Sequence, residues 1–258
     1  MSHGWRSTTF TGEAEMLDTL TDLSGKRWLS RGQAETYGRL QPSIDRAPRE
    51  RLTRVEKLRL ERQSIDIFRS TARSFGPGEG GAMYKDVVAL MVMRHYGVPT
   101  RLLDWSLSPF VAAYFASEKD GSDGEIWSFS YDKYIAMGNE QWNAMPGALR
   151  DGKWEAEFSA FTADDPPDWF ACNFYAGFPR QDAQRGLYSM TARFGRGHEE
   201  AIATLLRDPD SHSRFVVPSS LKPRLRQLLR EQHGIWRGSL FPDSAGAAET
   251  VISHIFAK

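Results

Sequence analysis

The densest group of reactive side chains lies in residues 95–109. This run brings together the imidazole of His95, the guanidinium of Arg101, the carboxylate of Asp104 and the hydroxyl of Ser106. Loops that hold polar groups beside apolar anchors commonly carry binding or catalytic sites. A structural alternative is that Arg101 and Asp104 form a buried ion pair that only holds the loop. Both interpretations stay open from the sequence.

His95 also has two interpretations. It lies on the inner stripe of an expected helix, where it could be a core histidine bonded to a backbone carbonyl or a general base near Asp104. The other histidines are scattered without the spacing of metal ligands, so we expect no metal site. The single cysteine, Cys172, has apolar neighbours and no adjacent base, which favours a buried hydrophobic role over a reactive thiol.

Composition narrows the class of protein. The chain has 258 residues, 40% of them hydrophobic, and 33 basic side chains balance 33 acidic ones. The zero net charge does not indicate nucleic acid as a partner, although a basic helix expected at 220–232 leaves local contact open. One cysteine and the lack of a long apolar run predict a cytoplasmic protein without a membrane partner.

Hydrophobic periodicity then gives the elements that position these residues. We predict a single α+β domain over residues 1–258, with a small mixed or antiparallel sheet flanked by helices. Residues 140–180 form no clean period, and we expect an irregular aromatic insertion that lines or covers a cleft. The expected helices are 12–23, 49–73, 83–96, 109–116, 220–232 and 245–256, the last two in a C-terminal region 219–258. The expected strands are 26–31, which ends on Arg31, then 125–131, 186–190 and 214–217.

Several separated motifs resemble the FRG domain, named for a Phe-Arg-Gly element. The signature spans residues 28–116, with Ser30 at the aromatic position of the family name, and a fainter echo covers 180–188. The matching stretches are Trp28-Leu29-Ser30-Arg31-Gly32-Gln33, Leu40-Gln41-Pro42-Ser43 with Arg46, Arg94-His95-Tyr96-Gly97-Val98-Pro99-Thr100-Arg101-Leu102-Leu103-Asp104-Trp105, and Ser108-Pro109 leading to Tyr114-Phe115-Ala116.

A second, weaker resemblance is to the ADP-ribosyltransferase superfamily. An early strand ends in Arg31, a polar turn at 104–106 opens a helix, and a later polar residue, Gln184, precedes a strand. This resemblance implies an ADP-ribosyltransferase-like fold and NAD as co-substrate. Mapped onto this sequence, it gives Arg31 the role of positioning NAD, residues 104–106 the turn that supports the nicotinamide pocket, and Gln184 the late polar role. The candidate catalytic residues are Arg31, His95, Asp104 and Gln184. The candidate cofactor-binding residues are Arg31, Gln33, Tyr37, Arg101, Trp105 and Ser106.

Gln184 stands where the superfamily has an acid. Glutamine carries no negative charge to stabilise an oxocarbenium-like ribose, so Asp104, Asp182 or another acid would have to supply it. The first hypothesis is therefore an NAD-dependent transferase acting on a protein or nucleic-acid acceptor, such as a toxin or phage-defence effector. The second is a non-catalytic module that binds a nucleotide or an RNA end in the same cleft. A nuclease using His95, Arg101 and Asp104 is a third, with no second carboxylate nearby to hold a metal.

Overall fold

Seven strands form one mixed sheet in the order β1-β7-β4-β2-β3-β6-β5. The structure is a computed structural model, and it describes residues 4–72, 85–143, 162, 166 and 168–256. β1 and β7 run parallel, and the other neighbouring strands run antiparallel. The strands are β1 (Arg6–Thr9), β2 (Trp28–Gln33), β3 (Leu103–Ser106), β4 (Gly124–Ser130), β5 (Phe170–Phe174), β6 (Gly186–Thr191) and β7 (His212–Val217).

β4 lies inside the sheet, and every one of its residues is buried. Its side chains alternate between the two faces, as strand geometry requires. Trp127 and Phe129 enter a cluster with helix α9, whereas Ile126 packs with helix α4 on the other face. Both faces of the sheet are therefore covered by apolar side chains.

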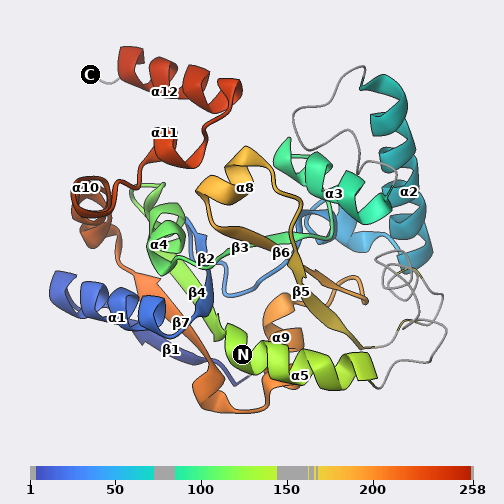
Figure 1. Ribbon diagram of the computed structural model, residues 1–258, viewed down its shortest axis with the longest axis horizontal. Helices are drawn as coiled ribbons and strands as arrows, with labels where there is room; N and C mark the ends of the chain where they lie inside the picture. Colours follow the sequence, from blue (N-terminus) through green and yellow to red (C-terminus); the bar gives the residue numbers. More distant parts are fainter. Residues whose placement is uncertain (1–3, 73–84, 144–161, 163–165, 167, 257–258) are drawn as a thin grey trace.

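Helices cover both faces of the sheet (Figure 1). α4 packs against β2 and β4 and is itself contacted by α1 and α10, while α5 and α9 pack together on the other face. The principal helices are α1 (Glu13–Gly25), α2 (Arg54–Thr71), α3 (Asp86–His95), α4 (Pro109–Ser117), α5 (Tyr131–Asn143), α8 (Pro179–Ala183), α9 (His198–Leu206), α10 (Lys222–His233), α11 (Arg237–Leu240) and α12 (Ser244–Phe256).

The sheet is nearly divided between β2 and β3. These strands are paired only at Ser30 and Ser106, whereas β2 pairs with β4 along its whole length from Trp28 to Gln33. No further residue pair joins these two strands within the described part of the chain. Residues of both strands line the cavity described below.

The predicted α+β class with a mixed sheet is confirmed. Each predicted helix and strand has a counterpart within a few residues. The last residue of the predicted helix 49–73 and the first two residues of the predicted helix 83–96 lie outside the described part. β5 is a regular strand within the region expected to be irregular, and 144–161, 163–165 and 167 of that region are not described. Elements β1, α5, α8, α9 and α11 were not predicted. Residues 104–106 were expected to form a polar turn, but they belong to strand β3, because they pair with β6.

Two further predictions concern single features. Cys172 is fully buried, as predicted, and burial raises the pKa of its thiol well above the ordinary value. Its position on β5 places it in the apolar cluster shared with α9. Among the described residues, no helix combines the length and the apolar character needed to cross a bilayer.

Candidate functional site

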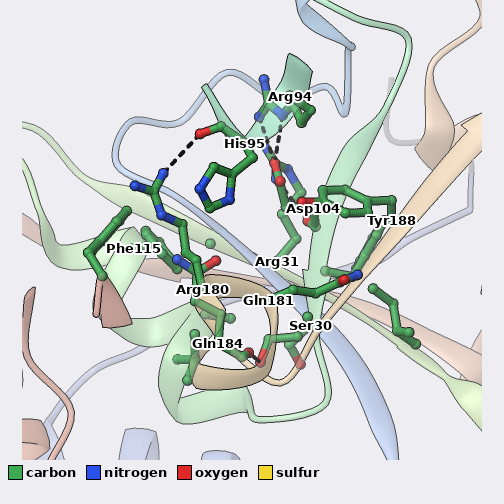
Figure 2. A pocket seen from close by; sticks show the side chains of 18 of the residues that line it. Ser30, Arg31, Arg94, His95, Asp104, Phe115, Arg180, Gln181, Gln184 and Tyr188 are labelled. Carbon is green, nitrogen blue, oxygen red and sulfur yellow. Dashed lines mark hydrogen bonds and ion pairs between the residues drawn. The ribbon is translucent and has the colours of Figure 1, made fainter. Parts of the chain in front are cut away.

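A cavity of about 550 Å³ opens where β2 and β3 separate. Its polar side chains come from β2, α3, β3 and α8, elements that are far apart in the sequence but meet here (Figure 2). Its apolar wall includes Phe115, Tyr188 and Phe241. Its charged and polar residues include Arg31, Arg94, His95, Asp104, Arg180 and Gln184.

Asp104 lies between two arginines, and we call Arg31, Arg94 and Asp104 the Asp104 cluster. The Arg94 Nε and Nη2 atoms donate to Asp104 Oδ2 at 3.0 and 2.6 Å. The Arg31 Nη1 atom donates to the Asp104 backbone oxygen at 2.8 Å and to Oδ2 at 3.3 Å. The three bonds to the carboxylate all use Oδ2, and no side chain in the described part of the chain bonds to Oδ1, which can accept from a ligand.

The cluster also keeps unused donors. Arg31 Nε is buried without a hydrogen-bond partner among the described residues. Arg31 Nη2 and Arg94 Nη1 donate no hydrogen bond within the described part of the chain. The Asp104 side chain keeps 39% of its surface exposed, so these groups are not sealed in the core. A ligand that enters the cavity can therefore meet both free donors and a free acceptor.

Electrostatics keep the cluster ionised. Burial opposes ionisation of Asp104, but the charges of Arg94 and then Arg31 outweigh it and lower the pKa of the carboxyl. Burial lowers the pKa of Arg31 to about 10, partly offset by Asp104, so its guanidinium still carries a proton at neutral pH. Two positive charges then face one negative charge, and the cluster has a net positive charge that favours an anionic ligand.

The position after Arg31 has room only for glycine. A Cβ atom at this position would lie 1.8 Å from the backbone oxygen of Ala112 in α4, closer than any real contact. The absence of a side chain lets α4 pack directly on β2. α4 in turn contributes Val111, Ala112 and Phe115 to the cavity wall, so the glycine brings the helix to the edge of the site.

A second polar group lies across the cavity, and we call His95, Arg180 and Asp243 the Arg180 cluster. Arg180 Nε and Nη2 contact Asp243 Oδ2 at 3.0 and 2.7 Å, and Nη1 donates to the His95 backbone oxygen at 3.0 Å. The His95 Nε2 atom lies 3.6 Å from Asp243 Oδ2. His95 thus faces Asp243 rather than Asp104.

Ser106 and Gln184 join the two walls. Ser106 Oγ donates to the Gln184 backbone oxygen at 2.7 Å and accepts from the Ser108 backbone N–H at 2.9 Å. The Gln184 side-chain amide donates to the Leu240 backbone oxygen at 3.1 Å. Both residues line the cavity, and their side-chain hydrogen bonds hold its walls together.

Trp105 points to the opposite face of the sheet. Its indole N–H donates to Ser189 Oγ at 2.7 Å, and its ring packs edge-on against Phe129 at 4.8 Å. Ser189 also bonds to His198 of α9, whose pKa is lowered to about 3 by burial and by the charge of Arg31. Trp105 is among the residues that line the cavity, but these contacts hold its ring in the apolar cluster with α9. Because side chains alternate along β3, Asp104 and Ser106 point to the other face of the strand.

The other three predicted cofactor-binding residues are not among those that line the cavity. Gln33 is buried and donates to Glu125 and to the Arg39 backbone. Tyr37 is 57% exposed and bonds to Glu35. Arg101 is 1% exposed and forms a bidentate pair with Glu61.

These contacts correct the alternative of an Arg101–Asp104 ion pair. Arg101 instead pairs with Glu61 of α2, and Asp104 pairs with Arg31 and Arg94. Alternation along β3 turns Asp104 toward the cavity. Arg101 lies before β3 begins, and its side chain faces α2. The loop is held by a buried pair, as that alternative supposed, but the partner is a different carboxylate.

Arg94, Arg180 and Tyr188 line the cavity, and no role was predicted for any of them from the sequence. Arg94 lies beside His95 in a stretch that resembles the FRG motifs, and Arg180 and Tyr188 lie in the fainter echo at 180–188. That position was the only signal available for them. Among the described residues, no group of three or more His, Cys, Asp and Glu side chains is placed to hold a metal ion.

The fold and the cavity together define an α+β domain with a net cationic site at a break in its central sheet. Comparison with protein-family models finds the FRG domain over residues 26–125. This range contains β2, α3, β3 and α4, which supply the Asp104 cluster and the helical wall beside it. The chain therefore contains an FRG domain over these residues. No curated protein and no solved structure matches it.

Proposed function

We propose that this protein binds NAD in the cavity and transfers its ADP-ribose group to a protein or nucleic-acid acceptor, as an ADP-ribosyltransferase-like enzyme. The observation that carries the proposal is Asp104, a carboxylate kept ionised by two guanidiniums with one oxygen free at a cavity wall. The proposal combines an anion-binding group with a negative charge that can act on a ribose.

The phosphates of NAD require positive donors. Guanidinium groups bind phosphate oxygens through paired N–H donors, and they do so most strongly where water is partly excluded. Arg31 and Arg94 each keep an unused nitrogen, and their charges exceed that of Asp104. In this proposal these two arginines bind the pyrophosphate.

The transfer step breaks the bond between ribose C1′ and the nicotinamide nitrogen, and the electron pair of that bond leaves with neutral nicotinamide. C1′ then gains a bond to a nucleophilic atom of the acceptor, and the proton of that atom passes to a base or to water. Positive charge develops on the ribose during the step. A fixed carboxylate such as Asp104 stabilises that charge.

Asp104 also takes over the role that Gln184 cannot perform. The Gln184 amide is neutral and donates to the Leu240 backbone oxygen, so it supplies no negative charge to a ribose. Asp104 is the only acidic side chain among the described residues that line the cavity. The proposal therefore depends on this one carboxylate.

The test is nicotinamide release from NAD by the purified protein, with and without a cell lysate as acceptor source, followed by chromatography. We expect release that Asp104→Asn and Arg31→Ala reduce at least tenfold. The matched controls Asp22→Asn and Arg224→Ala remove the same charges at exposed positions on α1 and α10 and should leave release unchanged. Absence of release, of transfer and of any NAD-induced rise in Tm would reject the proposal.

A second candidate is a non-catalytic module that holds a nucleotide or an RNA end in the same cavity. The observation in its favour is Gln184, whose neutral amide is engaged with the backbone where the transferase pattern has an acid. This candidate predicts that NAD or ADP-ribose raises Tm, that Arg31→Ala removes the rise, and that no nicotinamide appears.

A further inference from the structure

The C-terminal segment contributes Phe241 to the cavity wall, and its neighbours Leu240 and Asp243 contact other residues of that wall. The Leu240 backbone oxygen accepts from Gln184, and the Phe241 ring lies 4.8 Å from the guanidinium carbon of Arg180. Asp243 adds the ion pair with Arg180 and the approach to His95. Residues 240–243 therefore contact three polar side chains that line the cavity, those of Gln184, Arg180 and His95.

Arg180 is the group most affected by this arrangement. It lines the cavity, yet its Nε and Nη2 atoms are used by Asp243 and its Nη1 atom by the His95 backbone oxygen. A carboxylate bound to the edge of an arginine has the geometry and charge with which that arginine would bind a phosphate or carboxylate of a ligand. Asp243 therefore occupies a ready anion-binding position.

Asp243 directly precedes α12, which is attached to the domain mainly through α11. In Figure 1, α12 lies outside the body of the domain, beyond α10 and α11. Val251, Ile252 and Ile255 of α12 are more than half exposed. By contrast, Leu240 is 2% exposed and belongs to the apolar cluster under α4. Displacing Asp243 with α12 would leave the buried anchor at Leu240 in place.

We propose that Arg180 is a second anion-binding group of the cavity, and that Asp243 occupies it until a phosphate or carboxylate of the ligand displaces the Asp243 side chain. The inference rests on the binding part of the proposed function, a phosphate-bearing ligand in this cavity, and not on the transfer reaction. With the Asp104 cluster on the opposite wall, the cavity then has two cationic positions, which suits a ligand with two separated polar ends.

The variant Asp243→Asn tests this competition because it removes the charge and keeps the helix cap. Asp243 Oδ1 accepts from the Gly246 backbone N–H at 2.8 Å at the start of α12, and asparagine caps helices as well as aspartate does. We expect Asp243→Asn to bind ADP-ribose and inorganic pyrophosphate about three- to tenfold more tightly in calorimetry, the worth of one partly exposed ion pair. Arg180→Gln in the same background should abolish the gain.

Asp182→Asn is the matched control. Asp182 lies on α8 two residues from Arg180 and bonds to Tyr175, so its loss changes the charge of the region without freeing Arg180. We expect its affinity for both probes to equal that of the unmodified protein. Asp243→Ser, which also retains a capping oxygen, repeats the main test if the asparagine variant has a reduced Tm.

The outcomes separate this inference from the proposed function. Tighter binding of either probe by Asp243→Asn, lost on Arg180→Gln, supports the inference even if no nicotinamide is released from NAD. Unchanged or weaker binding by both Asp243 variants, or a complete absence of probe binding, overturns it even if NAD is consumed. An equal gain from Asp182→Asn would also overturn it, because general electrostatics would then explain the effect.

Discussion

Two arginine–carboxylate clusters lie three residues apart along the same stretch of chain, and they differ in what they leave unused. Arg101 and Glu61 are paired through both carboxylate oxygens at 2.7 and 2.8 Å, with side chains only 2% and 3% exposed. The Asp104 cluster uses one carboxylate oxygen, has guanidinium nitrogens that bond to no described residue, and exposes 39% of the Asp104 side chain.

The difference distinguishes a structural pair from a binding site. Buried charges stabilise a fold only when their hydrogen-bonding groups find partners inside it, which Arg101 and Glu61 achieve. A site must instead retain unsatisfied groups at a surface that a ligand can reach, and their desolvation by the ligand then contributes to binding. The same residue types thus serve two purposes according to their access to the cavity.

The largest effect is expected from breaking the buried pair. Glu61→Ala would leave the Arg101 charge buried without its partner, and we expect unfolding free energy to fall by about 3–5 kcal/mol in urea titrations. Asp66→Ala, an exposed change on the same helix, should alter it by less than about 0.5 kcal/mol. If both variants lost the same small amount, the structural role of the pair would be wrong.

Much of the site follows from the sequence because it is local. Asp104 and Ser106 lie in one short run before a proline-started helix, and Arg31 lies on a predicted strand that continues past the predicted end to Gln33. Alternation along β3 could even have separated Asp104 from the Trp105 ring. The resemblance to the FRG motifs then brought Arg31 and this run into one site.

The rest depends on contacts that periodicity does not encode. Arg94 sits in the last turn of a helix, where a basic residue is usually explained by the helix dipole and by solvent. Arg180 belongs to a five-residue helix too short to show a period, and Asp243 reaches it from 63 residues away in the sequence. The partner of Arg101 was mistaken for the same reason, since Glu61 lies on a helix 40 residues earlier.

A smaller loss of stability is expected from opening the exposed cluster. Asp104→Asn removes the charge that two partly exposed arginines share, and we expect unfolding free energy to fall by about 1–2 kcal/mol. Nicotinamide release from NAD should fall far more, at least tenfold, because the carboxylate acts on the ribose charge that develops during transfer. A loss of stability as large as that of Glu61→Ala, with nicotinamide release retained, would make Asp104 a second structural pair.

The same carboxylate should make stability depend on pH in a defined window. The folded pKa of Asp104 is lowered, so its contribution is fully present above the unfolded value near 4 and is lost as the pH falls through the folded pKa. The pKa of His198 is lowered to about 3, so this residue also destabilises the fold as the pH falls below about 6.5. It does so in the unmodified protein and in Asp104→Asn alike.

The difference between the unmodified protein and Asp104→Asn isolates the carboxylate. Urea unfolding measured from pH 7 to pH 3 should give a constant difference down to about pH 5 and a shrinking one below about pH 4. A difference that stayed constant at pH 3, or that grew, would show that Asp104 is not stabilised as an anion in the folded protein.

The smallest effect on stability, and the sharpest test of the comparison, is expected from Tyr188. Its side chain is only 6% exposed, it lies beside Asp104 in the register of β3 and β6, and its hydroxyl has no hydrogen-bond partner within the described part of the chain. Burial and then the charge of Asp104 raise its pKa, so the hydroxyl stays protonated and can donate to a ligand. Tyr188→Phe removes only that donor. Unfolding free energy should change by less than about 0.5 kcal/mol, whereas ADP-ribose affinity should fall about three- to tenfold, the worth of one neutral hydrogen bond.

Tyr134→Phe is the matched control. The Tyr134 hydroxyl accepts from the Cys172 backbone N–H, so this variant should show the reverse, a stability loss with unchanged affinity. If the two variants changed stability and ADP-ribose affinity equally, the Tyr188 hydroxyl would not be a ligand contact.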